Sequence, residues 1–148
     1  MKSFHFSLQR VLEWRSLQVR TEEEKLATIQ NKLAQVVERE NALVAAQLSA
    51  EMHLLGQQSA EGSEFRALAA FQLRIRSERV ALSESRQKFE EQVAEQRKRL
   101  LKARRDAKVL ENLKDRRKVA WTYLSDRELE NTAFESYISS WVRSNSEQ

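Results

Sequence analysis

The chain has 148 residues, the length of one ordinary domain, with a formal net charge of +4, no proline, no cysteine and only two glycines. Charged residues make up 32% of it and aromatic residues 7%, a balance typical of long exposed helices rather than of a compact globule. The absence of cysteine excludes disulfides, thiolate metal sites and cysteine nucleophiles, and no apolar run approaches the roughly 20 residues that a membrane span requires.

The first predicted element is a long helix over about residues 4–55, a stretch without proline or glycine. Its apolar residues recur in alternating steps of three and four, the spacing of a coiled-coil seam. They are Leu8, Leu12, Val19, Leu26, Ile29, Leu33, Val36, Leu43 and Ala50. Polar side chains interrupt the series at Arg15, Glu22, Glu40 and Gln47. The tract therefore predicts a coiled-coil helix with an imperfect seam.

Both glycines lie in the polar segment 56–63, which is the predicted turn. Gly56 is expected to end the first helix in the left-handed conformation, and Ser63 is expected to cap the second helix. If the chain folds back here, residue i lies opposite roughly residue 119 − i in an antiparallel pair.

The second predicted helix covers about residues 64–125 or beyond, and its seam is stricter. One position of the seven-residue repeat holds Leu68, Ile75, Leu82, Phe89, Gln96, Ala103, Leu110, Arg117 and Leu124. The companion position holds Phe65, Gln72, Arg79, Arg86, Val93, Leu100, Ala107, Lys114 and Trp121. A period of 3.5 residues held this long indicates supercoiling against a partner helix. The tail to residue 148 either continues this helix or remains partly disordered.

Together these patterns predict an all-α fold in which two long helices form one antiparallel coiled-coil hairpin, with the second helix longer. A monomeric hairpin is favoured over an obligate dimer of two chains.

Some apolar residues near the turn fall outside the seam positions. We name them the turn-proximal patch: Val44, Leu48, Leu55, Phe71, Leu73 and Val80. An exposed apolar patch usually marks a binding surface. The alternative, equally weighted, is that these residues widen the seam locally.

The other end of the predicted hairpin is basic and aromatic. Residues 97–118 contain eleven Lys or Arg and three acidic residues. A solvated charged face is the first interpretation of such a run, a protein partner the second, and nucleic acid the third. Aromatic residues at this end suit either insertion into a partner or local packing. We name as the open-end cluster Trp14, Arg97, Lys98, Arg104, Arg105, Lys108, Lys114, Arg116, Arg117, Lys118 and Trp121.

No catalytic constellation is apparent. The two histidines, His5 and His53, stand far apart, and neither a phosphate-binding glycine motif nor a nucleophile-elbow motif occurs. A two-helix hairpin also offers no enclosed pocket. We therefore expect no enzymatic activity, no cofactor, no metal and no small-molecule substrate.

Two stretches resemble a known family. The opening Phe4-His-Phe-Ser-Leu-Gln-Arg-Val-Leu12, followed by Trp14-Arg15, is similar to the F-x-F-x-L-x-x-V-L-x-x-R start of the flagellar export protein FliJ. Leu110-Glu-Asn-Leu-Lys-Asp-Arg-Arg117 is similar to that family's L-E-x-L-K-x-R-R stretch. Each motif alone is weak, but their order and spacing make the combination more specific.

The resemblance implies a coiled-coil stalk of the flagellar type III export apparatus, cytoplasmic and peripheral to the inner membrane at the flagellar base. Its implied partners are the hexameric export ATPase, which the open end would enter, the cytoplasmic domain of the export gate, which the turn-proximal patch would engage, and export chaperones. Injectisome stalk proteins share this architecture, and a nucleic-acid-binding or structural coiled coil remains a further alternative.

Overall fold

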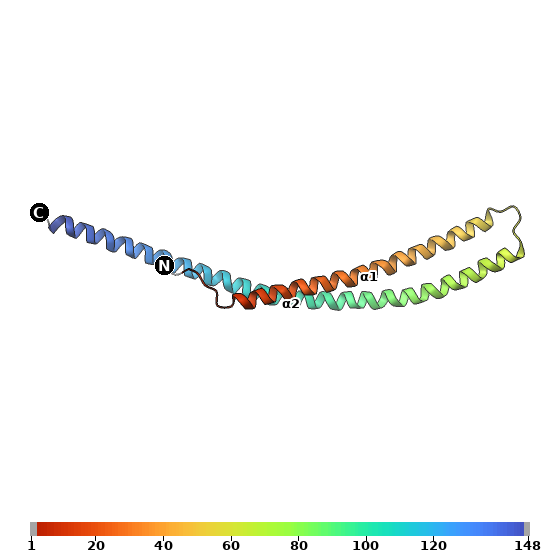
Figure 1. Cartoon of the computed structure of the whole chain (residues 1–148), viewed down its shortest axis with the longest axis horizontal. Coiled ribbons are helices and arrows are strands. Elements are labelled where there is room, and N and C mark those ends of the chain that lie inside the picture. Colours follow the sequence, from red (N-terminus) through yellow and green to blue (C-terminus); the bar gives the residue numbers. More distant parts are fainter. Residues whose placement is uncertain (1–2, 147–148) are drawn as a thin grey trace. The chain divides into compact units, whose positions relative to one another are not determined.

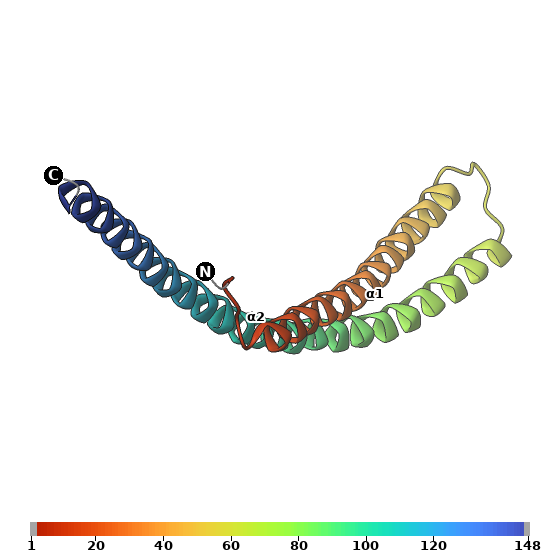
Figure 2. The same cartoon turned by 60° about the vertical axis from the view of Figure 1, so that its left-hand side comes forward.

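The structure, a computed structural model, describes residues 3–146 and consists of two helices in this range. Helix α1 covers Gln9–Leu55 and helix α2 covers Gly62–Ser146, 47 and 85 residues respectively. The helices pack against each other as an antiparallel pair joined by a short turn (Figure 1 and Figure 2). The predicted all-α hairpin with a longer second helix is confirmed. Within the described residues, neither helix has an apolar stretch long enough to cross a membrane.

The first helix begins at Gln9, later than the start expected near residue 4. The Gln9 N–H donates to the carbonyl of Phe6 at 3.1 Å in a turn, and the Leu8 carbonyl accepts the first helical bond from the Leu12 N–H at 2.9 Å. Phe6 is only 4% exposed. Burying a phenylalanine contributes about 2 kcal/mol, more than an additional turn of helix offers through intrinsic propensity. The first residues therefore leave the helical path to bury this ring.

The turn between the helices is shorter than expected, because α2 already starts at Gly62. The prediction that Gly56 adopts the left-handed conformation is wrong, because no described residue, glycine included, has a positive φ. The Gly56 N–H instead donates to the Met52 carbonyl at 3.0 Å, an ordinary helical bond.

The expected Ser63 cap is also wrong, since Ser63 lies inside α2. Glu61 occupies the capping position, and its carbonyl accepts from the Phe65 N–H at 3.4 Å. The Glu64 side chain accepts from the Glu61 N–H at 2.9 Å, which is one half of a capping box.

The tail is helical through Ser146, and residues 147–148, which the expected tail included, lie outside the described residues. The packing divides the chain into two units. Unit 1 consists of Met1–Val19 and Ala103–Gln148, and unit 2 consists of Arg20–Lys102.

The core of unit 2 is the predicted seam, extended by Leu54, which the prediction did not include. Its most buried apolar side chains are Leu43, Leu54, Ile75, Val93 and Leu100. Each follows the steps of three and four that define a coiled coil.

Three of the four polar residues that interrupt the seam of α1 have partners on α2, whereas Gln47 donates to Glu51 on α1 itself at 2.9 Å. Within unit 2, Glu40 accepts from Arg86 at 3.2 Å, and the Gln96 amide donates to the carboxylate and the backbone carbonyl of Glu22. Polar partners at seam positions specify the register of a coiled coil. The interruptions at Glu22 and Glu40 are therefore sites of contact between the two helices.

Unit 1 has a smaller core, in which Phe6, Leu12 and Ala107 are buried. Here too the interrupting residue of α1 is paired, because Arg15 lies 3.1 Å from Asp106. The seam prediction is wrong for Leu124 in this unit and for Phe65 in unit 2, which are 58% and 55% exposed. Leu124 lies beyond the stretch that α1 covers, and Phe65 lies beside the turn.

Candidate partner-binding surfaces

The turn-proximal patch lies within unit 2, and five of its six residues are exposed. Val44, Leu48, Leu55, Leu73 and Val80 have exposed side chains, whereas Phe71 is half-buried. These five do not widen the seam. Leu48 is one helical turn from Val44, and Leu73 is two turns from Val80, so each pair shares one face of its helix.

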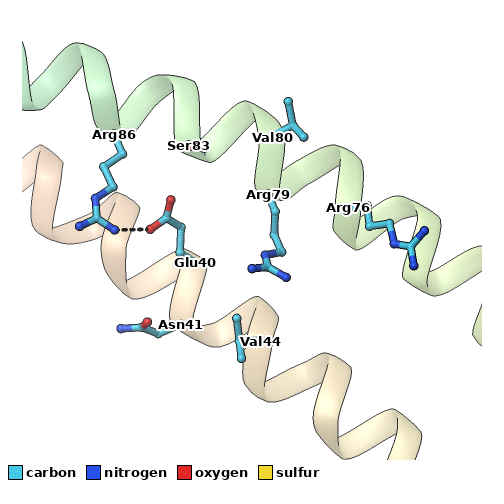
Figure 3. Close-up of a pocket in the computed structure, with 8 residues that line it drawn as sticks. All are labelled: Glu40, Asn41, Val44, Arg76, Arg79, Val80, Ser83 and Arg86. Atoms are coloured by element: carbon cyan, nitrogen blue, oxygen red, sulfur yellow. Dashed lines mark hydrogen bonds and ion pairs between the residues drawn. The ribbon is translucent and has the colours of Figure 1, made fainter.

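A groove lies between the helices on this side of unit 2. It has a volume of about 690 Å³ and is lined by Glu40, Asn41 and Val44 from α1 and by Arg76, Arg79, Val80, Ser83 and Arg86 from α2. Figure 3 shows Arg79 reaching from α2 toward α1, with Arg86 bound to Glu40 farther along the groove. The groove therefore combines two apolar walls, Val44 and Val80, with three guanidinium groups.

Arg86 is the cation of the groove that carboxylates of the hairpin bind. Its guanidinium donates to Glu90 at 2.9 Å and to Glu40 at 3.2 Å, and these bonds raise the pKa of Arg86 above the ordinary arginine value. Arg86 is thus a fixed cation, held by two carboxylates.

The open-end cluster is divided between the units. Arg97 and Lys98 are exposed in unit 2, and the remaining residues of the cluster belong to unit 1. Within unit 1, Arg105, Arg116 and Lys118 are exposed on α2. Lys108 is paired with Glu111 at 3.4 Å, and Lys114 is half-buried.

Two members of the open-end cluster, Arg117 and Trp121, contact the first residues of the chain. The Arg117 guanidinium lies 5.7 Å from the centre of the Phe6 ring and donates to the Ser7 hydroxyl at 3.1 Å. The Trp121 ring lies 5.9 Å from that of Phe4, tilted by 56°. We name these contacts the N-terminal clamp. They give Trp121 the local packing that was one of its two expected roles, and they give Arg117 an intramolecular contact as well.

Trp14 behaves differently from Trp121. Its ring is 51% exposed and lies under the Arg15 guanidinium, 4.9 Å from the ring centre. Because Arg15 also pairs with Asp106, it connects the exposed tryptophan to the seam of unit 1.

A further apolar surface of unit 1 lies outside the residues predicted as sites. We name it the tail stripe: the exposed Leu129, Phe134, Tyr137, Ile138, Trp141 and Val142. Phe134, Tyr137, Ile138 and Trp141 recur in steps that place them on one face of α2. The signal that could have identified it is this helical spacing, which sets in after the heptad repeat has ended.

No group of three or more metal-ligating side chains occurs among residues 3–146. The surfaces therefore offer apolar side chains and charge for recognition, on an all-helical framework. A comparison with protein-family models finds a match over most of the chain. The family model described as Flagellar FliJ protein matches residues 4–129. The chain belongs to the FliJ family. Comparisons with curated proteins and with solved structures find no match.

The two sequence stretches that resemble FliJ meet in unit 1. Phe4 and Phe6, from the first stretch, contact Trp121 and Arg117, and Arg117 closes the second stretch. Arg15, at the end of the first stretch, pairs with Asp106. In this FliJ-family chain the motif residues thus hold the first segment against α2.

The family match ends at residue 129, so most of the tail stripe lies beyond it. The turn-proximal patch and the groove lie within it. FliJ-family membership associates the chain with flagellar protein export.

Proposed function

We propose that this chain is a non-catalytic coiled-coil stalk of the flagellar type III export apparatus. Its unit 1 binds the export ATPase ring, and the turn-proximal patch of unit 2 binds the cytoplasmic domain of the export gate. Family membership over residues 4–129 supports the flagellar over the injectisome apparatus. Export chaperones are further proposed partners, and the proposed location is cytoplasmic, at the inner membrane through these partners.

The tail stripe is the observation that carries this proposal. Every residue of α2 from 126 to 146 is exposed, including three aromatic rings at Phe134, Tyr137 and Trp141. An isolated helix is only marginally stable in water, because most helix stability in proteins comes from packing of an apolar face. A contiguous exposed apolar face also marks an interaction site. A partner that surrounds the helix, such as the central opening of a ring, would cover this stripe.

The basic residues of unit 1 add a second contribution to ring binding. Arg105, Arg116 and Lys118 are exposed and have no acidic partner among the described residues. Exposed charges of one sign accelerate the encounter with a partner of opposite charge and favour one orientation. They also make binding dependent on ionic strength.

The turn-proximal patch supports a second, separate contact. Its five exposed apolar side chains lie in unit 2, whereas the tail stripe lies in unit 1. Binding energy at protein interfaces concentrates in a few buried apolar or aromatic anchors. Two groups of anchors in two units suit a monomeric stalk with two partners.

The test is the turnover of the cognate export ATPase with purified stalk protein. Wild-type chain should raise the turnover, because contacts to several subunits stabilise the assembled ring. Combined Phe134→Ala and Trp141→Ala should remove most of the stimulation. The matched control is combined Thr132→Ala and Ser139→Ala, which has the same spacing on the opposite face of α2 and should keep it. Unchanged turnover at saturating wild-type chain would refute the proposal.

A further inference from the structure

One arginine of the seam in unit 2 lacks the kind of partner that its neighbours have. Of the polar residues at seam positions of α2 in this unit, Gln72 donates to Glu51 at 2.9 Å, Arg86 binds Glu40, and Gln96 binds Glu22. Arg79 has no hydrogen bond or ion pair to any residue that the structure describes. Arg79 is therefore the seam cation of unit 2 whose charge the hairpin does not match.

The surroundings of Arg79 explain the missing partner. Where it approaches α1, the groove is lined by Asn41 and Val44, neither of which is acidic. The groove's one carboxylate, Glu40, is engaged by Arg86. Figure 3 shows Arg79 between Arg86 and Arg76 along α2, with its guanidinium turned into the groove.

The opposite face of unit 2 is built differently. At nearly the same level, Arg39 of α1 and Glu78 of α2 form a direct ion pair at 2.7 Å across the seam. Residues 78 and 79 are neighbours in sequence but point about 100° apart around the helix axis. One face of the seam is thus closed by a matched pair, and the other presents an unmatched cation between two valines.

We propose that this groove binds an amphipathic helix of a partner protein that carries Asp or Glu beside apolar residues. The Arg79 guanidinium would receive a carboxylate in a two-bond pair, the geometry in which arginine binds carboxylates most strongly. Val44 and Val80, which are 49% and 61% exposed, would pack against the apolar side chains next to that carboxylate. The inference rests on the proposed role of the turn-proximal patch, since Val44 and Val80 belong to both surfaces.

Charge and shape favour this occupant over others. A small molecule is normally buried over most of its surface, which a groove open to solvent along two helices does not provide. A nucleic-acid backbone would bring its phosphates against the Glu40 carboxylate and the two valines. A third helix packed in the groove between the two others can contact the two valines with apolar side chains and bind the arginine with a carboxylate at the same time.

The first arm of the test uses a synthetic amphipathic helical peptide that bears Glu beside a row of Leu, and a twin with Gln in place of Glu. Wild-type chain should bind the Glu peptide at least about tenfold more tightly than the Gln twin. Arg79→Glu should remove this preference, and Arg79→Lys should keep only part of it, because lysine acts as a point charge. The control Arg74→Glu makes the same charge change five positions away, on the other side of α2, and should bind like wild type.

Three results of this arm would overturn the inference: equal binding of both peptides, no binding of either, or full affinity in Arg79→Glu. Binding of duplex DNA that is lost in Arg79→Glu, without peptide binding, would assign the groove to phosphate instead. Circular dichroism of every variant checks that the hairpin remains folded.

The second arm repeats the titration with the purified cytoplasmic domain of the cognate export gate. If the chain prefers the Glu peptide but does not bind the gate domain, the proposed gate contact is rejected. The inference that the groove binds a carboxylate-bearing helix is then retained. Gate binding that is equal in wild type and Arg79→Glu would preserve the proposed function and reject the groove as its carboxylate-binding site.

Discussion

The two units of this chain use the same heptad pattern with different results. In unit 2, α1 and α2 accompany each other throughout, and polar seam residues such as Glu22 and Glu40 find partners on α2. In unit 1, α1 begins only at Gln9, and Phe4 and Phe6 cover a short part of α2, which continues uncovered beyond them. A paired seam stabilises a hairpin by itself, whereas an uncovered helix depends on what it binds.

The largest expected effect contrasts the seam with the turn-proximal patch. Ile75 is 3% exposed, and Ile75→Ala should lower the free energy of unfolding by about 3 kcal/mol through lost burial and the cavity left behind. Leu73, two residues away, is exposed, and Leu73→Ala should change the free energy of unfolding by less than about 0.5 kcal/mol. Thermal and urea unfolding followed by circular dichroism measures both. Equal losses would mean that the patch belongs to the core.

A smaller effect is expected in unit 1, where Phe6 anchors the N-terminal clamp. Phe6→Ala should cost about 2 kcal/mol locally, by removing the buried ring beneath Arg117. Hydrogen exchange should accelerate at the amides of Gln9 and Leu12, whose bonds to Phe6 and Leu8 begin the helix. As a control, Phe134→Ala removes a phenyl ring from the tail stripe instead and should leave the exchange rates of these two amides unchanged. Rapid exchange in the wild-type chain would contradict a stable clamp.

The polar seam of unit 2 predicts a dependence on pH. The Gln96 amide, followed by Lys25, lowers the pKa of Glu22 below the ordinary glutamate value of 4.5. The contribution of ionised Glu22 to stability is therefore present above about pH 4.5 and is lost as the pH falls through its lowered pKa in the folded state. Glu22→Gln should flatten the fall of the melting temperature in acid. Glu24→Gln, on an exposed site, should retain the wild-type slope, and identical slopes in the two variants would contradict this role of Glu22.

The smallest effect concerns the ion pair between Arg39 and Glu78, which closes the face opposite the groove. Both side chains are about half exposed, so solvent screens the pair. A double-mutant cycle with Arg39→Ala and Glu78→Ala should give a coupling energy of about 0.2–1 kcal/mol. A value well above this range would mean that this face, rather than the apolar seam, holds the helices together.

Sequence spacing was enough to predict the hairpin, because a seam repeated every seven residues has few alternative structures. Ile75, Val93 and Leu100 were identified as seam residues and are buried. The partners of Glu22 and Glu40 were not predicted, since they depend on the register between helices and on the reach of Gln96 and Arg86. The expected pairing of residue i with about 119 − i places Glu22 opposite residue 97, next to Gln96, but it places Glu40 opposite residue 79, seven positions from Arg86. Spacing along one helix does not fix the register more closely than this.

The surfaces were less predictable than the seam. Phe4 and Phe6 continue the first tract smoothly in sequence, and only the position of Arg117 and Trp121 on α2 shows why they leave the helix. Arg79 was identified as a polar seam residue, but its unmatched charge became visible only when the partners of Arg86 and Gln72 were known. A site defined by an absent partner cannot be found from one helix alone.

The central claim is that the tail stripe and the turn-proximal patch serve different partners. Photo-crosslinking residues placed at Phe134 and at Leu48, one at a time, test it in cells that assemble the export apparatus. The account predicts that the residue at 134 links the chain to the export ATPase and the residue at 48 links it to the export gate. The same partner at both positions, or the two partners exchanged, would contradict it.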